Sequence, residues 1–312
     1  MAAIIIHVPG SSDTSAPRVS AWRRAQSTPL GRVLLRVAFY GTFVFVALPM
    51  TFCHVMTSVA KQDIGPPPPG YELVTIESDG LKLRGWLARE KSTRPAVLIV
   101  HGFGDNLESY QNVGNTFRRR GHAMLLVDLR AHGGSEGRRT TLGDHERRDV
   151  RAAMARLRQE GLAKEGLIVL GYSLGATSTL LAAVDQPDLR AVIVESPFDT
   201  LRETIAHHGE LLYHLPRWLP IGPIAIAFAE ISGGFDADAV DAVEAARHVR
   251  APLMLLAGGA DERMPEAVVR RIYDAHPGPK RLWVVPHAPH VGALLHPEYD
   301  RRLDAFLVDN GL

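Results

Sequence analysis

The sequence predicts an α/β protein built on a doubly wound, mostly parallel β-sheet. Two observations predict this class. Over residues 71–312, short apolar runs typical of buried strands alternate with longer segments of helical pattern. These roughly 240 residues are also ample to bury a single core. The exception to the parallel order is expected at the start, where residues 71–77 and 81–88 flank the turn Ser78-Asp79-Gly80 and predict an antiparallel hairpin.

The remaining elements are expected in alternation along the chain. Apolar runs predict buried strands at 96–100, 166–170, 191–194, 252–257 and 281–285. Helical patterns lie near residues 107–120, 144–159, 176–183 and 201–213. The helix at 144–159 is expected to open with Thr141 and Asp144 as a capping box.

The N-terminal part of the chain has a different character. Residues 1–36 are rich in Ser, Pro, Ala and Arg, and we expect a flexible basic tail there. Residues 37–56 are apolar and uncharged when His54 is neutral. At about 1.5 Å per residue they are long enough to cross a hydrocarbon core of about 30 Å. A transmembrane helix is therefore predicted at 37–56, followed by a Pro-rich linker at 57–70.

The charges around this apolar run predict its orientation. Lys61 is the only basic residue of the linker, whereas five arginines precede the run: Arg18, Arg23, Arg24, Arg32 and Arg36. The positive-inside rule then places the N-terminus in the cytoplasm and residues 71–312 outside. Two alternatives stay open. The run is also compatible with a signal peptide cleaved after Ala60, because Ser58 and Ala60 are small, or with an amphipathic helix buried in the fold.

Gly171-Tyr172-Ser173-Leu174-Gly175 is the most informative motif of the chain. It follows the apolar run 166–170 and precedes a helical segment, which is the strand–turn–helix context of a G-x-S-x-G nucleophile elbow. In such an elbow the glycines let strand and helix approach closely while the serine hydroxyl stands exposed. Serine is a poor nucleophile by itself, so the motif requires a base and an acid elsewhere.

Candidates for both partners follow later predicted strands. Asp261 lies just after the run 252–257, and His290 lies just after the run 281–285. Since the carboxyl ends of parallel strands share one edge of a sheet, Ser173, Asp261 and His290 are expected to lie close together. The order Ser, Asp, His is the one found with such an elbow.

At these motifs the chain resembles the α/β-hydrolase superfamily over residues 71–312. His101-Gly102-Phe103-Gly104 is similar to the superfamily's HG-type oxyanion loop. The segment from Asp128 to Ser135 is similar to its D-x-R-G-x-G-x-S turn, although Ala131 stands where the first glycine is usual. The resemblance implies a Ser173–His290–Asp261 triad with no cofactor. It also implies an oxyanion hole made by the backbone N–H groups of Phe103 and Leu174.

Both the acid and the base of the expected triad have an alternative candidate in the sequence. Asp199 follows the run 191–194, where some relatives keep their acid. We favour Asp261 because the spacing to Pro265 matches the family, and because Asp199 is well placed to cap the helix 201–213. His287 is an alternative to His290 as the general base. We favour His290 because the sequence that follows it, leading into the last helix, matches the family.

Composition argues against other classes of function. The formal net charge is +1, and the run Arg118–Arg120 falls at a helix end where cations offset the helix dipole, so a nucleic-acid partner is not expected. Two histidine pairs, His207 with His208 and His287 with His290, could suggest a metal site. Neither has a third ligand at a familiar spacing, so no metal site is expected. The single Cys53 allows no internal disulfide.

The resemblance also frames the substrate. Residues 197–250 exceed what a strand-to-strand crossover needs, and they predict either a small helical cap with an apolar acyl-binding wall or a helix packed on the core. The expected function is a serine hydrolase acting on small-molecule or lipid carboxylic esters or thioesters. The alternatives are an acyl peptidase, an acyltransferase or an inactive binding module on the same fold.

Overall fold

The computed structural model describes residues 28–62, 64–90 and 92–312, so most of the tail expected at 1–36 lies outside it. The described chain divides into two units, with the boundary between Leu48 and Pro49. In the first unit, α2 (Pro29–Thr42) is followed by the π-helical turn η1 (Phe43–Ala47). The helix begins at Pro29 rather than at residue 37, because the Thr28 side chain accepts the Gly31 N–H at 3.0 Å and Pro29 suits a first helical position.

The helical run from Pro29 to Thr57 has 29 residues and is long and apolar enough to span a membrane. Its last part, α3 (Leu48–Thr57), belongs to the second unit from Pro49 onward. There Phe52, Cys53 and Thr57 are buried. Part of the predicted span 37–56 therefore packs within the second unit.

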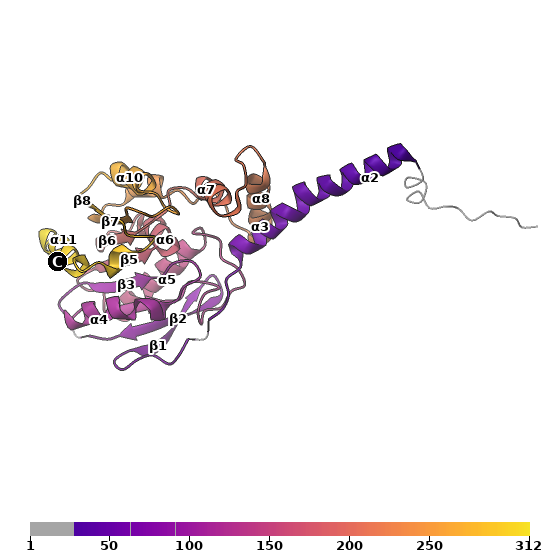
Figure 1. The fold of residues 1–312 in the computed structure, drawn as a ribbon. Coiled ribbons are helices and arrows are strands. Elements are labelled where there is room, and N and C mark those ends of the chain that lie inside the picture. The colour runs from indigo at the N-terminus through magenta and orange to yellow at the C-terminus, as the bar shows by residue number, and fades with distance from the viewer. Residues whose placement is uncertain (1–27, 63, 91) are drawn as a thin grey trace, which may run out of the picture. The chain divides into compact units, whose positions relative to one another are not determined.

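The second unit is built on one sheet of eight strands in the order β1-β2-β4-β3-β5-β6-β7-β8 (Figure 1). Only β1 and β2 run antiparallel to their neighbours, as predicted. The strands are β1 (Glu72–Ser78), β2 (Leu81–Ala88), β3 (Ala96–Val100), β4 (Met124–Val127), β5 (Leu167–Tyr172), β6 (Leu189–Glu195), β7 (Leu253–Gly258) and β8 (Lys280–Val285). Asp79 and Gly80 both have positive φ, as the tight turn between β1 and β2 requires.

Helices cover both faces of this sheet, which makes it doubly wound. Buried side chains of α4 (Gln111–Arg119) and α11 (Tyr299–Asp309), such as Phe117 and Phe306, join one core cluster with β3 and β5. The other helices contact one another in series: α5 (Glu146–Gln159), α6 (Leu174–Ala183), α9 (Ala242–His248) and α10 (Glu266–Ala275). The predicted helix 107–120 starts as a short 3-10 turn, Leu107–Tyr110, capped by the Asn106 side chain.

The segment between β6 and α9 carries two extra helices, α7 (Leu201–Tyr213) and α8 (Ile221–Gly233). Thr200 caps α7, since its side chain accepts the Glu203 N–H at 3.4 Å. The capping role expected for Asp199 is therefore wrong: its carboxylate accepts the Thr200 N–H and pairs with Arg271 instead.

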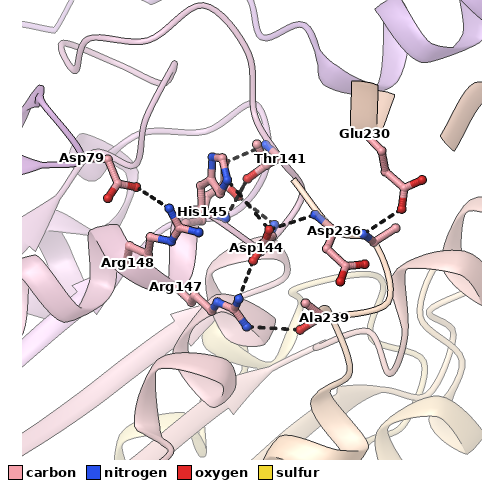
Figure 2. A network of polar contacts seen from close by, with 12 residues as sticks. Asp79, Thr141, Asp144, His145, Arg147, Arg148, Glu230, Asp236 and Ala239 are labelled. Atoms are coloured by element: carbon pink, nitrogen blue, oxygen red, sulfur yellow. Dashed lines mark hydrogen bonds and ion pairs between the residues drawn. The ribbon is translucent and has the colours of Figure 1, made fainter. Parts of the chain in front are cut away.

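The capping box expected from Thr141 and Asp144 is also wrong, because α5 begins two residues later, at Glu146. The buried Glu146 carboxylate accepts the N–H groups of Thr141 (2.9 Å) and Gly143 (2.8 Å) and two threonine hydroxyls. The Asp144 carboxylate contacts groups other than the first N–H groups of α5. Figure 2 shows its carboxylate between Arg147 and the Asp236 N–H, at 2.6 and 3.0 Å, which ties the segment after α8 to the start of α5.

Candidate functional site

Ser173 stands at the sharp turn between β5 and α6. Its φ of 52° and ψ of −114° lie in a region that non-glycine residues rarely adopt, which is the strain of a nucleophile elbow. The flanking glycines are required by space. A Cβ on Gly171 would lie 2.4 Å from a backbone oxygen, and a Cβ on Gly175 would lie 2.3 Å from another. Without a side chain at Gly171, β5 can approach α6, and without one at Gly175, α6 can approach the end of β3.

The structure brings Ser173, His290 and Asp261 into one hydrogen-bonded chain. The Ser173 Oγ lies 2.9 Å from His290 Nε2, and His290 Nδ1 lies 2.8 Å from Asp261 Oδ2. An ionised carboxylate can only accept, so Nδ1 carries the ring proton and Nε2 accepts from the serine hydroxyl. The three residues come from the loops that follow β5, β7 and β8. Their catalytic roles stay a prediction.

Asp261 is held firmly behind the imidazole. Its Oδ1 accepts the backbone N–H groups of Arg263 at 3.0 Å and Met264 at 2.9 Å. Burial by itself raises the pKa of this carboxyl, but the hydrogen bond and charge of His290 and the Met264 amide outweigh burial and lower the pKa overall. The carboxylate is therefore ionised and oriented toward His290.

The rival residues lie elsewhere. Asp199 pairs with Arg271, whose Nε lies 2.9 Å from its Oδ2, and it makes no hydrogen bond to His290. His287 is exposed in the turn after β8, with a positive φ of 59°. Of the two acids and two histidines that the sequence offered, only Asp261 and His290 meet at Ser173.

The loop after β3 is pinned beside Ser173 by His101. The buried His101 Nε2 accepts the Leu129 N–H at 3.0 Å, so Nδ1 carries the proton and donates to the Gly102 carbonyl at 2.7 Å. Burial, together with the neighbouring His132, lowers the pKa of His101 to about 3, so it is neutral at physiological pH. A Cβ on Gly102 would lie only 3.3 Å from the Ser173 Cβ, so this backbone approaches the serine closely.

Two backbone amides beside Ser173 have no partner. Within the described part of the chain, neither the Phe103 N–H nor the Leu174 N–H donates to a protein acceptor. Leu174 is the first residue of α6, where orphan N–H groups and the positive end of the helix dipole favour negative charge. The two residues predicted for an oxyanion hole thus keep free donors, and both line the pocket that contains Ser173.

That pocket has a volume of about 230 Å³. Its walls are mostly apolar and include Phe198, Leu201, Ile205 and Leu212, three of which belong to α7. No aspartate or glutamate is among the described residues that line it. The described chain also places no group of three or more His, Cys, Asp or Glu where a metal ion would be held.

Glu195 is a residue near the site that the sequence interpretation missed. Its carbonyl accepts the Ser173 N–H at 2.9 Å, and its Oε1 accepts the N–H of Ala293 at 2.6 Å, in the loop that carries His290. Burial, with a smaller contribution from the Asp261 charge, raises the pKa of Glu195 to about 7, although the Ala293 amide opposes this shift. The available signal was a single carboxylate at the end of the apolar run 191–194.

Comparisons with known proteins agree with the α/β-hydrolase fold. Residues 91–221 match the family model described as serine aminopeptidase, S33. The uncharacterized protein Rv2307c of Mycobacterium tuberculosis is 30% identical over 231 residues, covering 72% of this chain and 73% of its own. The uncharacterized protein YqkD of Bacillus subtilis is 27% identical over 215 residues, 68% of this chain and 70% of its own. Among solved structures, the esterase Pf2001 of Pyrococcus furiosus superposes with a TM-score of 0.67 at 26% identity, over 81% of this chain and 98% of its own.

Proposed function

Because this chain belongs to the α/β-hydrolase superfamily, we propose that it is a serine hydrolase that cleaves carboxylic esters or thioesters through Ser173, His290 and Asp261. The observation that carries the proposal is the hydrogen-bonded chain from the Ser173 hydroxyl through His290 to Asp261, at 2.9 and 2.8 Å. Such a chain supplies a nucleophile, a general base and a group that holds the base in the correct tautomer.

The geometry supports an acyl-enzyme mechanism. As Ser173 Oγ attacks the carbonyl carbon, His290 Nε2 takes the hydroxyl proton, and the carbonyl oxygen becomes an oxyanion. The free N–H groups of Phe103 and Leu174 would stabilise that charge. Collapse of the intermediate breaks the bond to the alcohol or thiol, which leaves with the proton from His290. Water, activated by His290, then releases the acid and regenerates Ser173.

The pocket favours an ester over an aminopeptidase substrate. An aminopeptidase must bind the positively charged α-amino group of its substrate close to the nucleophile, which requires a carboxylate partner. Among the described residues that line the Ser173 pocket there is no such carboxylate, and most are apolar. An uncharged acyl group is the better match for these walls.

A fluorophosphonate probe tests the nucleophile. It should label the wild-type protein and the Ser178→Ala variant but not the Ser173→Ala variant. Ser178 is a matched control because it lies on α6, the helix that begins directly after Ser173, and its hydroxyl donates to the Leu174 carbonyl at 2.7 Å. Labelling that survives Ser173→Ala, or loss of labelling in both variants, would remove Ser173 from the reaction.

We further propose that the helix beginning at Pro29 anchors the enzyme in a membrane, with the N-terminus in the cytoplasm and the catalytic unit outside. Since Phe52, Cys53 and Thr57 are buried in the second unit, the lipid-facing span moves from 37–56 to 29–48. These 20 residues measure about 30 Å as a helix. Arg32 and Arg36 lie in its N-terminal half, where long basic side chains extend to the lipid headgroups.

Membrane extraction and protease access test this topology. The full chain should remain with the membrane in alkaline carbonate, and protease added outside right-side-out vesicles should digest the catalytic unit. Release by carbonate contradicts a span, whereas full protection from the protease contradicts the orientation.

A further inference from the structure

One wall of the Ser173 pocket comes from α3, far from the catalytic residues in sequence. Phe52, Val55 and Met56 all line this pocket together with Ser173. On the same side, the Phe52 ring makes an edge contact with the ring of Tyr213 at the end of α7, with centroids 5.2 Å apart. The segment that the sequence assigned to a membrane span or linker therefore also contributes side chains to the candidate active site.

The position of α3 is set by buried contacts on its other faces. Phe52 and Cys53 are each 5% exposed. Cys53 and Met56 also line a small apolar cavity with Ile226 and Ala229 of α8, so α3 packs directly on the cap. These contacts bury apolar surface, which makes α3 part of the folded unit.

The end of α3 is also held by hydrogen bonds. The Thr57 carbonyl accepts the Thr140 N–H at 3.0 Å. The loop that starts at Thr140 is fixed in turn by the buried Glu146 carboxylate, which accepts four hydrogen bonds. From this loop Leu142, with a positive φ of 55°, lines the Ser173 pocket. The fixed loop therefore holds α3 and supplies a pocket residue at the same time.

Most of the described residues that line the pocket are apolar, and its arginine, Arg263, is exposed to solvent, so the pocket suits an uncharged apolar chain. His208, one of its few polar residues, has its pKa lowered to about 4, chiefly by burial, so it is neutral at physiological pH. A cavity of about 150 Å³ lined by apolar side chains accommodates a benzene molecule. This pocket has a volume of about 230 Å³. Scaled from the volume that holds the six carbons of benzene, it accommodates an acyl chain of roughly eight to ten carbons.

We propose that α3 forms one wall of the acyl pocket, and that the enzyme prefers esters of medium-length fatty acids, with roughly eight to ten carbons. The inference rests on the proposed hydrolase function, since it assigns the pocket to the acyl side of the substrate. It also implies that the working enzyme retains α3, because cleavage after Ala60 would remove the wall.

Substitutions on α3 of the full-length protein in detergent micelles test the wall. Val55→Trp adds a large ring at a pocket-lining position, and Met50→Trp adds the same ring at an exposed position of the same helix that does not line the pocket. The assay is kcat/KM for p-nitrophenyl esters from two to twelve carbons. Val55→Trp should lower kcat/KM for the eight- and ten-carbon esters at least tenfold while the two-carbon ester changes less than twofold. Met50→Trp should leave the whole profile unchanged.

The outcomes separate this inference from the proposed function. If Val55→Trp and Met50→Trp give the same chain-length profile, α3 is not the wall, even when Ser173 still reacts with the fluorophosphonate. A wild-type protein that hydrolyses no ester and takes no label contradicts the hydrolase function itself. Should Val55→Trp fail to fold, Met56→Ala serves instead: by enlarging the pocket it should shift the preferred ester to a longer chain, and an unchanged optimum overturns the inference.

Discussion

Replacing Asp261 with asparagine tests the proposed triad most directly. The Asp261 Oδ1 accepts two backbone N–H groups, at 3.0 and 2.9 Å, while Oδ2 accepts His290 Nδ1–H at 2.8 Å. In Asp261→Asn the amide oxygen must take the Oδ1 position, because an NH2 group there would face two donors. The asparagine NH2 group then faces His290 Nδ1.

This arrangement reverses the tautomer of His290. With a donor opposite Nδ1, the ring accepts there and carries its proton on Nε2, so it cannot take the proton of Ser173. The expected loss in kcat is about 10⁴-fold, or about 5.4 kcal/mol of transition-state stabilisation. Because the change is nearly isosteric, the free energy of unfolding should change far less than activity does.

The matched control is Asp199→Asn, since Asp199 is the other acid that follows a neighbouring strand, and its buried carboxylate pairs with the exposed Arg271 rather than with His290. Its effect on activity should stay within a few-fold, because the Asp199 carboxylate is hydrogen-bonded to Thr200 and Arg271 and to neither Ser173 nor His290. The assay is hydrolysis of a short p-nitrophenyl ester, with urea denaturation of all three proteins to compare their folding. Asp261→Asn activity within tenfold of wild type, or an equal loss in Asp199→Asn, would refute the reasoning.

Three further perturbations follow from buried groups. The pKa of Glu195 is raised to about 7 in the folded protein, so keeping this carboxyl folded costs stability once the unfolded chain ionises. This loss of stability grows as pH rises from about 4 to 7 and is complete above 7. Glu195→Gln should therefore be more stable than wild type in thermal melts at pH 8, by at most about 3 kcal/mol, with little difference near pH 4; an equal difference at both pH values would contradict this. Asp149→Ala removes the fully buried partner of the Arg130 guanidinium, 2.6 Å away, and leaves it only the partly exposed Asp79 at 3.0 Å, so the free energy of urea unfolding should fall by about 3–5 kcal/mol; a loss under 1 kcal/mol would argue against the pair. Gly175→Ala forces a Cβ to within 2.3 Å of a backbone oxygen and should abolish ester hydrolysis, whereas Gly222→Ala, whose nearest contact is 3.8 Å, should keep it; equal activity of the two would show that the elbow is less crowded than the structure indicates.

The local patterns that predicted the fold act over short sequence distances. The strand predicted at residues 96–100 has these bounds in the structure, because a continuous apolar run between polar segments has few other stable conformations. The start of a helix depends on more distant contacts as well. Thr141 and Asp144 fit the pattern of a capping box, but the N–H groups of this loop donate to the Glu146 carboxylate instead. A buried carboxylate needs such hydrogen bonds to offset its loss of hydration.

By itself, the sequence determined the alternation that makes a doubly wound sheet, and the order of Ser173, Asp261 and His290 on the loops that follow β5, β7 and β8 at one sheet edge. Only the tertiary structure decided that Asp261 rather than Asp199 meets the imidazole, and that Glu195 links the loops of Ser173 and His290. It alone also decided that Phe52, Val55 and Met56 enter the pocket instead of continuing an apolar span. The physical reason is that the apolar character of a residue predicts that its side chain is buried, but not which residues it contacts. Those contacts depend on how distant segments of the chain pack together.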